Sequence, residues 1–120
     1  MISKLILIAL GLMGLLFGGW AGFLAFENTT TMVSTLGLMG MMGYLFHSSV
    51  IFVSLTFPVD IRRKLTLLLL IWHIPETLLI AIFGMGIPEE SQLSGIAIHS
   101  GISLLALLSW YLAKADVGKE

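Results

Sequence analysis

Four ionisable side chains lie in the middle of long apolar stretches of this chain. They are His47, His73, Glu76 and His99. An ionisable group at membrane depth costs several kcal/mol, so it usually faces the protein interior and is often functional. The sequence therefore predicts that these four residues form a candidate cofactor-binding site inside the membrane.

Imidazole and carboxylate groups at these positions support two kinds of metal chemistry. Two histidines on facing helices can ligate a b-type haem, and His47 and His73 are the pair at the most similar depth. In a second interpretation, His73, Glu76 and His99 hold a transition metal such as iron, copper or zinc. His73 and Glu76 are spaced i and i+3, which makes them neighbours on one helix surface. Pro75 lies between them and usually kinks a helix.

Two further interpretations need no metal. The cluster can bind the head of a quinone or another polar small molecule and relay protons, because imidazole titrates near neutral pH. Alternatively, the four side chains hydrogen-bond one another and stiffen a bundle that acts only as a scaffold for a partner complex. The sequence leaves these alternatives open.

The composition shows which elements must position these residues. The chain has 120 residues, of which 58% are hydrophobic and only 11% are charged, whereas soluble domains contain about 25% charged residues. Spanning helices need roughly 20 apolar residues. Four stretches reach that length, and they are Ile2–Phe26, Met32–Phe57, Leu65–Gly86 and Leu93–Ala113. We expect an all-α polytopic membrane protein with one domain, an antiparallel four-helix transmembrane bundle with short connections.

The charge distribution predicts the orientation of such a bundle. One membrane face receives every basic residue of the chain, namely Lys4, Arg62, Arg63, Lys64, Lys114 and Lys119. The opposite face receives Glu27, Glu89 and Glu90. Because Lys and Arg accumulate in cytoplasmic loops, the N- and C-termini are both expected in the cytoplasm.

Glycine stripes predict where helices approach closely. Gly14, Gly18 and Gly22 are spaced by four in the first helix, which gives it a smooth groove. A second stripe in the next helix consists of Gly37, Gly40 and Gly43. These six residues are predicted helix-packing positions, either within the bundle or against a neighbouring protein.

The chain as a whole resembles the small four-helix membrane proteins of the DoxX-like family. The resemblance lies in the length, the helix count, Trp20 late in the first helix, the basic turn Arg62-Arg63-Lys64, and polar residues within the third and fourth helices. It covers most of the chain and implies association with a membrane oxidoreductase. No catalytic residue is carried over from the family.

These observations together predict a small subunit of a larger, redox-linked membrane complex, rather than a self-sufficient enzyme. The expected partners are the lipid bilayer, other integral membrane subunits, and a quinone or another small apolar molecule, with no nucleic acid. The candidate cofactors are haem b or a transition metal, and otherwise none. A structural accessory subunit without a cofactor and a stand-alone protein that binds a small molecule are the alternatives. The chain contains no cysteine, which excludes iron–sulfur clusters ligated by this chain alone.

Overall fold

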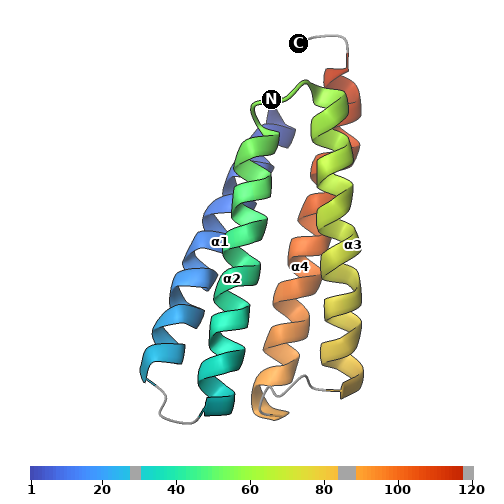
Figure 1. The fold of residues 1–120 in the computed structure, drawn as a ribbon. Helices are drawn as coiled ribbons and strands as arrows, with labels where there is room; N and C mark the ends of the chain where they lie inside the picture. The colour runs from blue at the N-terminus through green and yellow to red at the C-terminus, as the bar shows by residue number, and fades with distance from the viewer. Residues whose placement is uncertain (28–30, 84–88, 118–120) are drawn as a thin grey trace.

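The computed structural model is built from four long helices (Figure 1). It describes residues 1–27, 31–83 and 89–117, and the side chains of 1–27, 37–83 and 92–117. The elements are α1 (Ile2–Glu27), α2 (Thr31–Ser54), α3 (Val59–Phe83), α4 (Glu89–Ala113) and a short 3-10 helix, η2 (Lys114–Asp116). All four long helices are long and apolar enough to cross a membrane.

The helix ends differ from those predicted from hydropathy. The second helix ends at Ser54 rather than Phe57, and the third begins at Val59 rather than Leu65. Pro58 has no N–H group and stands outside the helix, while its carbonyl accepts the first bond, from the Arg62 amide, at 3.0 Å. The basic residues Arg62, Arg63 and Lys64 therefore lie inside α3, because the helix extends beyond the apolar region that hydropathy detects. The predicted end of the third helix at Gly86 lies outside the described residues.

The other boundaries also shift at polar residues. The first helix includes Glu27, one residue beyond the predicted Phe26, and the second begins at Thr31 rather than Met32. The fourth helix begins at Glu89 instead of Leu93, because acidic residues are favourable in the first turn of a helix. Its predicted end at Ala113 agrees with the structure.

The four helices form two close pairs. The helix α1 packs most extensively against α2, and α3 against α4, while α2 and α3 share few contacts. Figure 1 shows the two pairs side by side, with the N-terminus and the C-terminal end of α4 near the α2–α3 connection. A buried apolar cluster joins the pairs on the side of that connection, and its members are Leu7, Leu10, Ile51, Leu69, Leu70, Ile102 and Ala106.

The small residues of α1 explain how closely the first pair approaches. Gly11, Gly14, Gly18 and Gly22 are all buried. A Cβ atom at Gly18 would lie 3.3 Å from the Cβ of Tyr44, and one at Gly22 would lie 2.6 Å from the sulfur of Met41. The backbone of α1 therefore lies against the side chains of α2, which fixes the rotation of α2 about its axis.

Polar contacts link α1, α3 and the C-terminal end of α4 at one end of the bundle. The N-terminal amine of Met1 lies 2.9 Å from the Asp116 carboxylate, and the Ser3 hydroxyl donates to the same oxygen at 3.0 Å. The buried Ser109 hydroxyl donates to the Ser3 carbonyl at 3.0 Å. The guanidinium of Arg63 stacks over the Trp110 ring at 4.7 Å. These contacts tie α1, α3 and α4 together at one end of the bundle.

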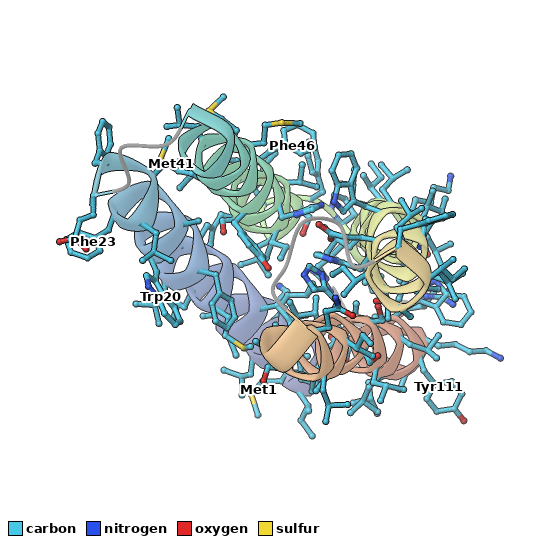
Figure 2. All side chains as sticks on the ribbon, turned by 90° about the horizontal axis from the view of Figure 1, so that it is seen from below. Met1, Trp20, Phe23, Met41, Phe46 and Tyr111 are labelled. Atoms are coloured by element: carbon cyan, nitrogen blue, oxygen red, sulfur yellow. The ribbon has the colours of Figure 1, made fainter. Side chains whose placement is uncertain are left out.

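The outward surface is apolar along the length of the helices. Leu16 is 73% exposed and Leu104 is 67% exposed. Figure 2 shows Trp20, Phe23 and Tyr111 on the periphery, directed away from the centre of the bundle. A soluble monomer rarely exposes so much contiguous apolar surface, whereas a lipid-facing bundle requires it.

Candidate functional site

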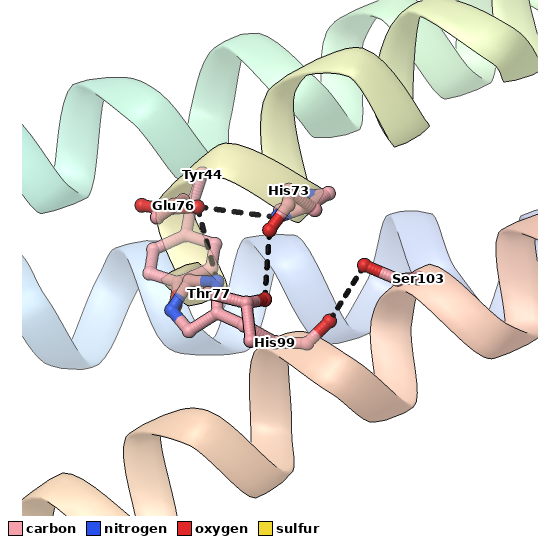
Figure 3. Close-up of polar contacts among 6 residues, drawn as sticks. All are labelled: Tyr44, His73, Glu76, Thr77, His99 and Ser103. Carbon is pink, nitrogen blue, oxygen red and sulfur yellow. Dashed lines mark hydrogen bonds and ion pairs between the residues drawn. The ribbon is translucent and has the colours of Figure 1, made fainter. Parts of the chain in front are cut away.

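Polar side chains from α3 and α4, with one from α2, meet in a single cluster (Figure 3). The first two come from α3, where His73 and Glu76 lie one helical turn apart. His73 Nδ1 lies 3.2 Å from Glu76 Oε2, at hydrogen-bonding distance. The His73 side chain is only 4% exposed, whereas that of Glu76 is 31% exposed. The carboxylate therefore lies at the more open side of the cluster.

His99 on α4 joins this pair from the facing helix. Its Nδ1 atom lies 3.0 Å from the same Glu76 oxygen. The two atoms are at ion-pair distance, but His99 Nδ1 has no hydrogen-bond partner among the described residues. A buried nitrogen that touches a carboxylate without a directed hydrogen bond is a notable exception to the rule that buried polar atoms are satisfied.

The three residues form a compact donor set, which we call the triad: His73, Glu76 and His99. One ligand atom from each residue can be chosen so that all three lie within 4.8 Å of one another. A tetrahedral ion with bonds of about 2.0–2.1 Å holds neighbouring ligand atoms about 3.3 Å apart. The two contacts of Glu76 Oε2, at 3.2 and 3.0 Å, are close to that spacing. The three residues therefore form a group that could hold a transition metal ion.

Tyr44 on α2 extends the cluster and was missed by the sequence analysis. Its hydroxyl lies 3.2 Å from His99 Nε2, and the two rings stack with centroids 6.1 Å apart. The available signal was its position three residues before His47, on the same helix face. Because Tyr44 contacts Nε2 of His99, the other ring nitrogen, Nδ1, is the one that lies next to Glu76.

His47 lies beside the triad without joining it. Its ring centroid is 4.4 Å from that of His73 and 5.3 Å from the Trp72 ring. The side chain is buried, and its Nδ1 has no hydrogen-bond partner among the described residues. The structure thus brings all four predicted site residues together, but it places only three of them as a common donor set.

The contact between His47 and His73 bears on the haem hypothesis. A haem held by this pair would lie between the two rings, with a metal–nitrogen bond of about 2 Å on each side. The rings instead lie against each other at 4.4 Å, inclined by 37°. This arrangement leaves no room for a macrocycle between them, so the pair as it stands does not fit haem b.

Hydroxyl groups follow the site residues by one turn on each helix. Thr77 donates to the carbonyl of His73 at 2.8 Å, and Ser103 donates to the carbonyl of His99 at 2.9 Å. Ser48 makes the same bond to the carbonyl of Tyr44 at 2.9 Å. These bonds satisfy the side-chain hydroxyl groups within each helix, because Ser and Thr can donate to the carbonyl one turn earlier.

The predicted glycine positions fall into two groups. Gly14, Gly18, Gly22 and Gly37 all lie in close contact with the facing helix of the first pair. Among the described residues, a Cβ at Gly40 would lie 3.6 Å from the Ala21 Cβ, and one at Gly43 would meet nothing within 4 Å. The second stripe therefore packs closely at Gly37 but not at Gly43.

Comparisons with known proteins add no relative: no family model matches the chain, and no curated protein or solved structure matches it either.

Proposed function

We propose that this chain is a small integral membrane protein whose triad binds one divalent transition metal ion within the bilayer. The observation that carries the proposal is the convergence of two imidazole nitrogens and one carboxylate oxygen within 4.8 Å at the centre of an apolar bundle. Ionisable groups are rarely placed at such depth without a function.

The donor set indicates which ions suit the triad. Two histidines and one carboxylate are the ligands of many zinc and non-haem iron sites, in which further positions stay open for water or substrate. Cysteine is absent from the chain, which removes the ligand that favours closed structural zinc sites. The partial exposure of the Glu76 side chain, 31%, is consistent with such an open position.

Tyr44 supports this proposal as a residue that orients a ligand. A metal-bound histidine usually donates its second N–H group to a neighbouring acceptor, which fixes the ring and its tautomer. The Tyr44 oxygen lies 3.2 Å from His99 Nε2 and can accept that bond. His99 is then held with Nδ1 toward Glu76. A bound ion would supply Lewis acidity or redox chemistry at this position.

The test is a metal titration of the protein in lipid nanodiscs. We expect the wild-type chain to bind one equivalent of Zn²⁺ or Fe²⁺. We expect His99→Ala and Glu76→Gln to weaken binding by more than about 100-fold, since the first removes a direct ligand and the second replaces a charged carboxylate ligand with a neutral amide. His47→Ala is the matched control, because it removes a buried histidine outside the donor set. The cofactor-free scaffold alternative predicts no stoichiometric metal in any of these proteins.

We further propose that the helices form an antiparallel bundle with both termini in the cytoplasm. The support is the charge asymmetry, which puts all six basic residues at one end. Because the chain has no cysteine, single cysteines can report on each end. A cysteine replacing Ser91 should react with an impermeant thiol reagent outside intact cells, and one replacing Lys119 should not. The opposite labelling pattern would reverse the orientation.

The proposal places the chain within a larger, redox-linked membrane assembly. Its support is the size of the bundle, the resemblance to DoxX-like proteins, and an exposed apolar surface large enough for lipid and protein neighbours alike. Crosslinking in native membranes should produce a heteromeric band. Recovery of a monodisperse monomer from every mild detergent would contradict the subunit role while leaving the metal site untouched.

A further inference from the structure

Trp72 differs from the other two tryptophans of the chain in its depth. Trp20 lies in the last third of α1 and Trp110 in the last turn of α4, and tryptophan is usual near helix ends in membrane proteins because its ring meets the polar interface. Trp72 lies in the middle of α3 and is 52% exposed. Its ring contacts that of His47, but its indole N–H has no hydrogen-bond acceptor among the described residues. Hydrocarbon supplies no acceptor, so this donor needs a protein partner.

A backbone acceptor lies beside this donor at the same depth. Pro75 has no N–H group, so the carbonyl of Ile71, four residues earlier, loses its helical partner. A neighbouring hydroxyl can satisfy such a carbonyl in a membrane helix, but Thr77, the next hydroxyl along α3, donates to His73 instead. Ile71 is 68% exposed, and Pro75 is exposed as well. The freed carbonyl therefore lies on the outward face of α3, next to Trp72.

The surface around these two groups is free to pack against another helix. The helix α3 packs extensively against α4 but shares few contacts with α2. Exposed side chains continue above and below Trp72 at helical spacing, and we call the whole set the α3 face: Leu68, Ile71, Trp72, Pro75, Leu79 and Ile82. Lipid satisfies apolar side chains, but it satisfies neither an N–H donor nor a carbonyl acceptor. The two polar groups therefore distinguish the α3 face from the rest of the outward surface.

We propose that the α3 face binds a second copy of this chain, with the Trp72 indole N–H of each copy donated to the Ile71 carbonyl of the other. Both copies insert into the membrane with the same orientation, so a two-fold axis along the membrane normal brings the same residues together at equal depth. A donor and an acceptor that are adjacent in the sequence then form two symmetric bonds. A different helix would need its own donor and acceptor at this depth, whereas a second copy supplies both. The proposal does not depend on the metal site, because no triad residue belongs to the α3 face.

The first test measures self-association in lipid vesicles by energy transfer between donor- and acceptor-labelled chains, each labelled through a cysteine that replaces Lys119. We expect a dimer that dissociates as the chain is diluted in lipid. Trp72→Phe keeps an aromatic ring and removes the N–H, so it should weaken dimerisation about tenfold, the range that two hydrogen bonds supply within a membrane. Trp20→Phe is the matched control, since Trp20 is 60% exposed on α1. A wild-type chain that stays monomeric at every protein-to-lipid ratio, or a Trp72 variant that dimerises as tightly as the wild type, would overturn the proposal.

Restoring the missing backbone donor provides the second test. Pro75→Ala gives residue 75 an N–H that pairs with the Ile71 carbonyl inside the helix, so the acceptor is lost although the helix itself becomes more stable. Dimerisation should weaken about as much as in Trp72→Phe. Because both substitutions remove the same two bonds, combining them should weaken dimerisation no further. Additive losses would show that the two groups do not bond to each other and would refute the assignment. If the double variant does not fold, the comparison of Trp72→Phe with Trp20→Phe decides alone.

Discussion

The two helix pairs of this protein have different kinds of residues on their facing surfaces. In the α1–α2 pair, glycines of α1 let its backbone approach the side chains of α2. In the α3–α4 pair, the facing surfaces carry the triad and its supporting hydroxyls. One pair is specified by the small size of its residues, and the other by their chemistry.

Tyr44 contacts both the glycine groove of the first pair and the polar site of the second. A Cβ at Gly18 would lie 3.3 Å from the Tyr44 Cβ, so the glycine groove determines where this tyrosine stands. Its hydroxyl then reaches His99 across the gap between the pairs, at 3.2 Å. Close helix packing in one pair thereby controls the geometry of a polar site in the other.

The largest effect is expected from filling the glycine groove. Gly14→Leu should lower the free energy of unfolding by at least about 2 kcal/mol, because even a Cβ at this position meets the Ser48 hydroxyl and lies 3.2 Å from the Tyr44 carbonyl. Gly19→Leu is the control, since a Cβ there meets nothing within 4 Å. Unfolding measured by steric trapping in bicelles distinguishes them. Equal destabilisation by both variants would show that the groove does not hold the pair together.

A smaller effect is expected at the link between the pairs. Tyr44→Phe should weaken metal binding about tenfold, as the loss of a group that orients a ligand usually does, while leaving the fold intact. Tyr111→Phe is the matched control, because Tyr111 is 66% exposed on the outer surface. Metal affinity is measured by competition with a chelator. An unchanged affinity in the Tyr44 variant would mean that the two pairs act independently.

The smallest effect is expected at the end of the second glycine stripe. Gly43→Ala should leave stability unchanged or raise it by up to about 1 kcal/mol, because alanine is the better helix former and the added methyl meets open space. Gly37→Ala should be destabilising, since its Cβ would lie 2.8 Å from the Ala25 Cβ. Thermal unfolding of the two variants gives the comparison. A cost at Gly43 equal to that at Gly37 would point to a neighbour outside this chain.

Much of the architecture could be predicted from composition, and the remainder could not, for identifiable reasons. Hydropathy located all four helices because each contains a long apolar run. It placed the start of the third helix six residues late, at Leu65 instead of Val59. The residues before Leu65 are helical, but several of them are charged, so hydropathy does not detect them. Hydropathy measures the membrane-embedded part of a helix, not its hydrogen bonds.

The candidate site was predictable in its residues but not in its connections. Helical spacing alone made His73 and Glu76 neighbours, and similar depth put His47 level with His73. The sequence named His73, Glu76 and His99 as a possible metal set. Depth along an axis does not give the rotation of one helix relative to another, so it could not predict that His99 Nδ1 lies 3.0 Å from Glu76 Oε2 or that the His47 ring lies against the rings of His73 and Trp72. Tyr44 was overlooked because a tyrosine in an apolar helix has the appearance of a lipid-facing or packing residue.

X-ray absorption spectroscopy of the zinc-loaded protein in nanodiscs tests the central claim most directly. The account predicts nitrogen and oxygen ligands at about 2.0–2.1 Å, with outer-shell scattering from two imidazole rings. It also predicts that His99→Ala loses one of the two imidazole contributions, while His47→Ala retains both. A spectrum without imidazole scattering, or one that His99→Ala leaves unchanged, would contradict the assignment of His73, Glu76 and His99 as a metal site.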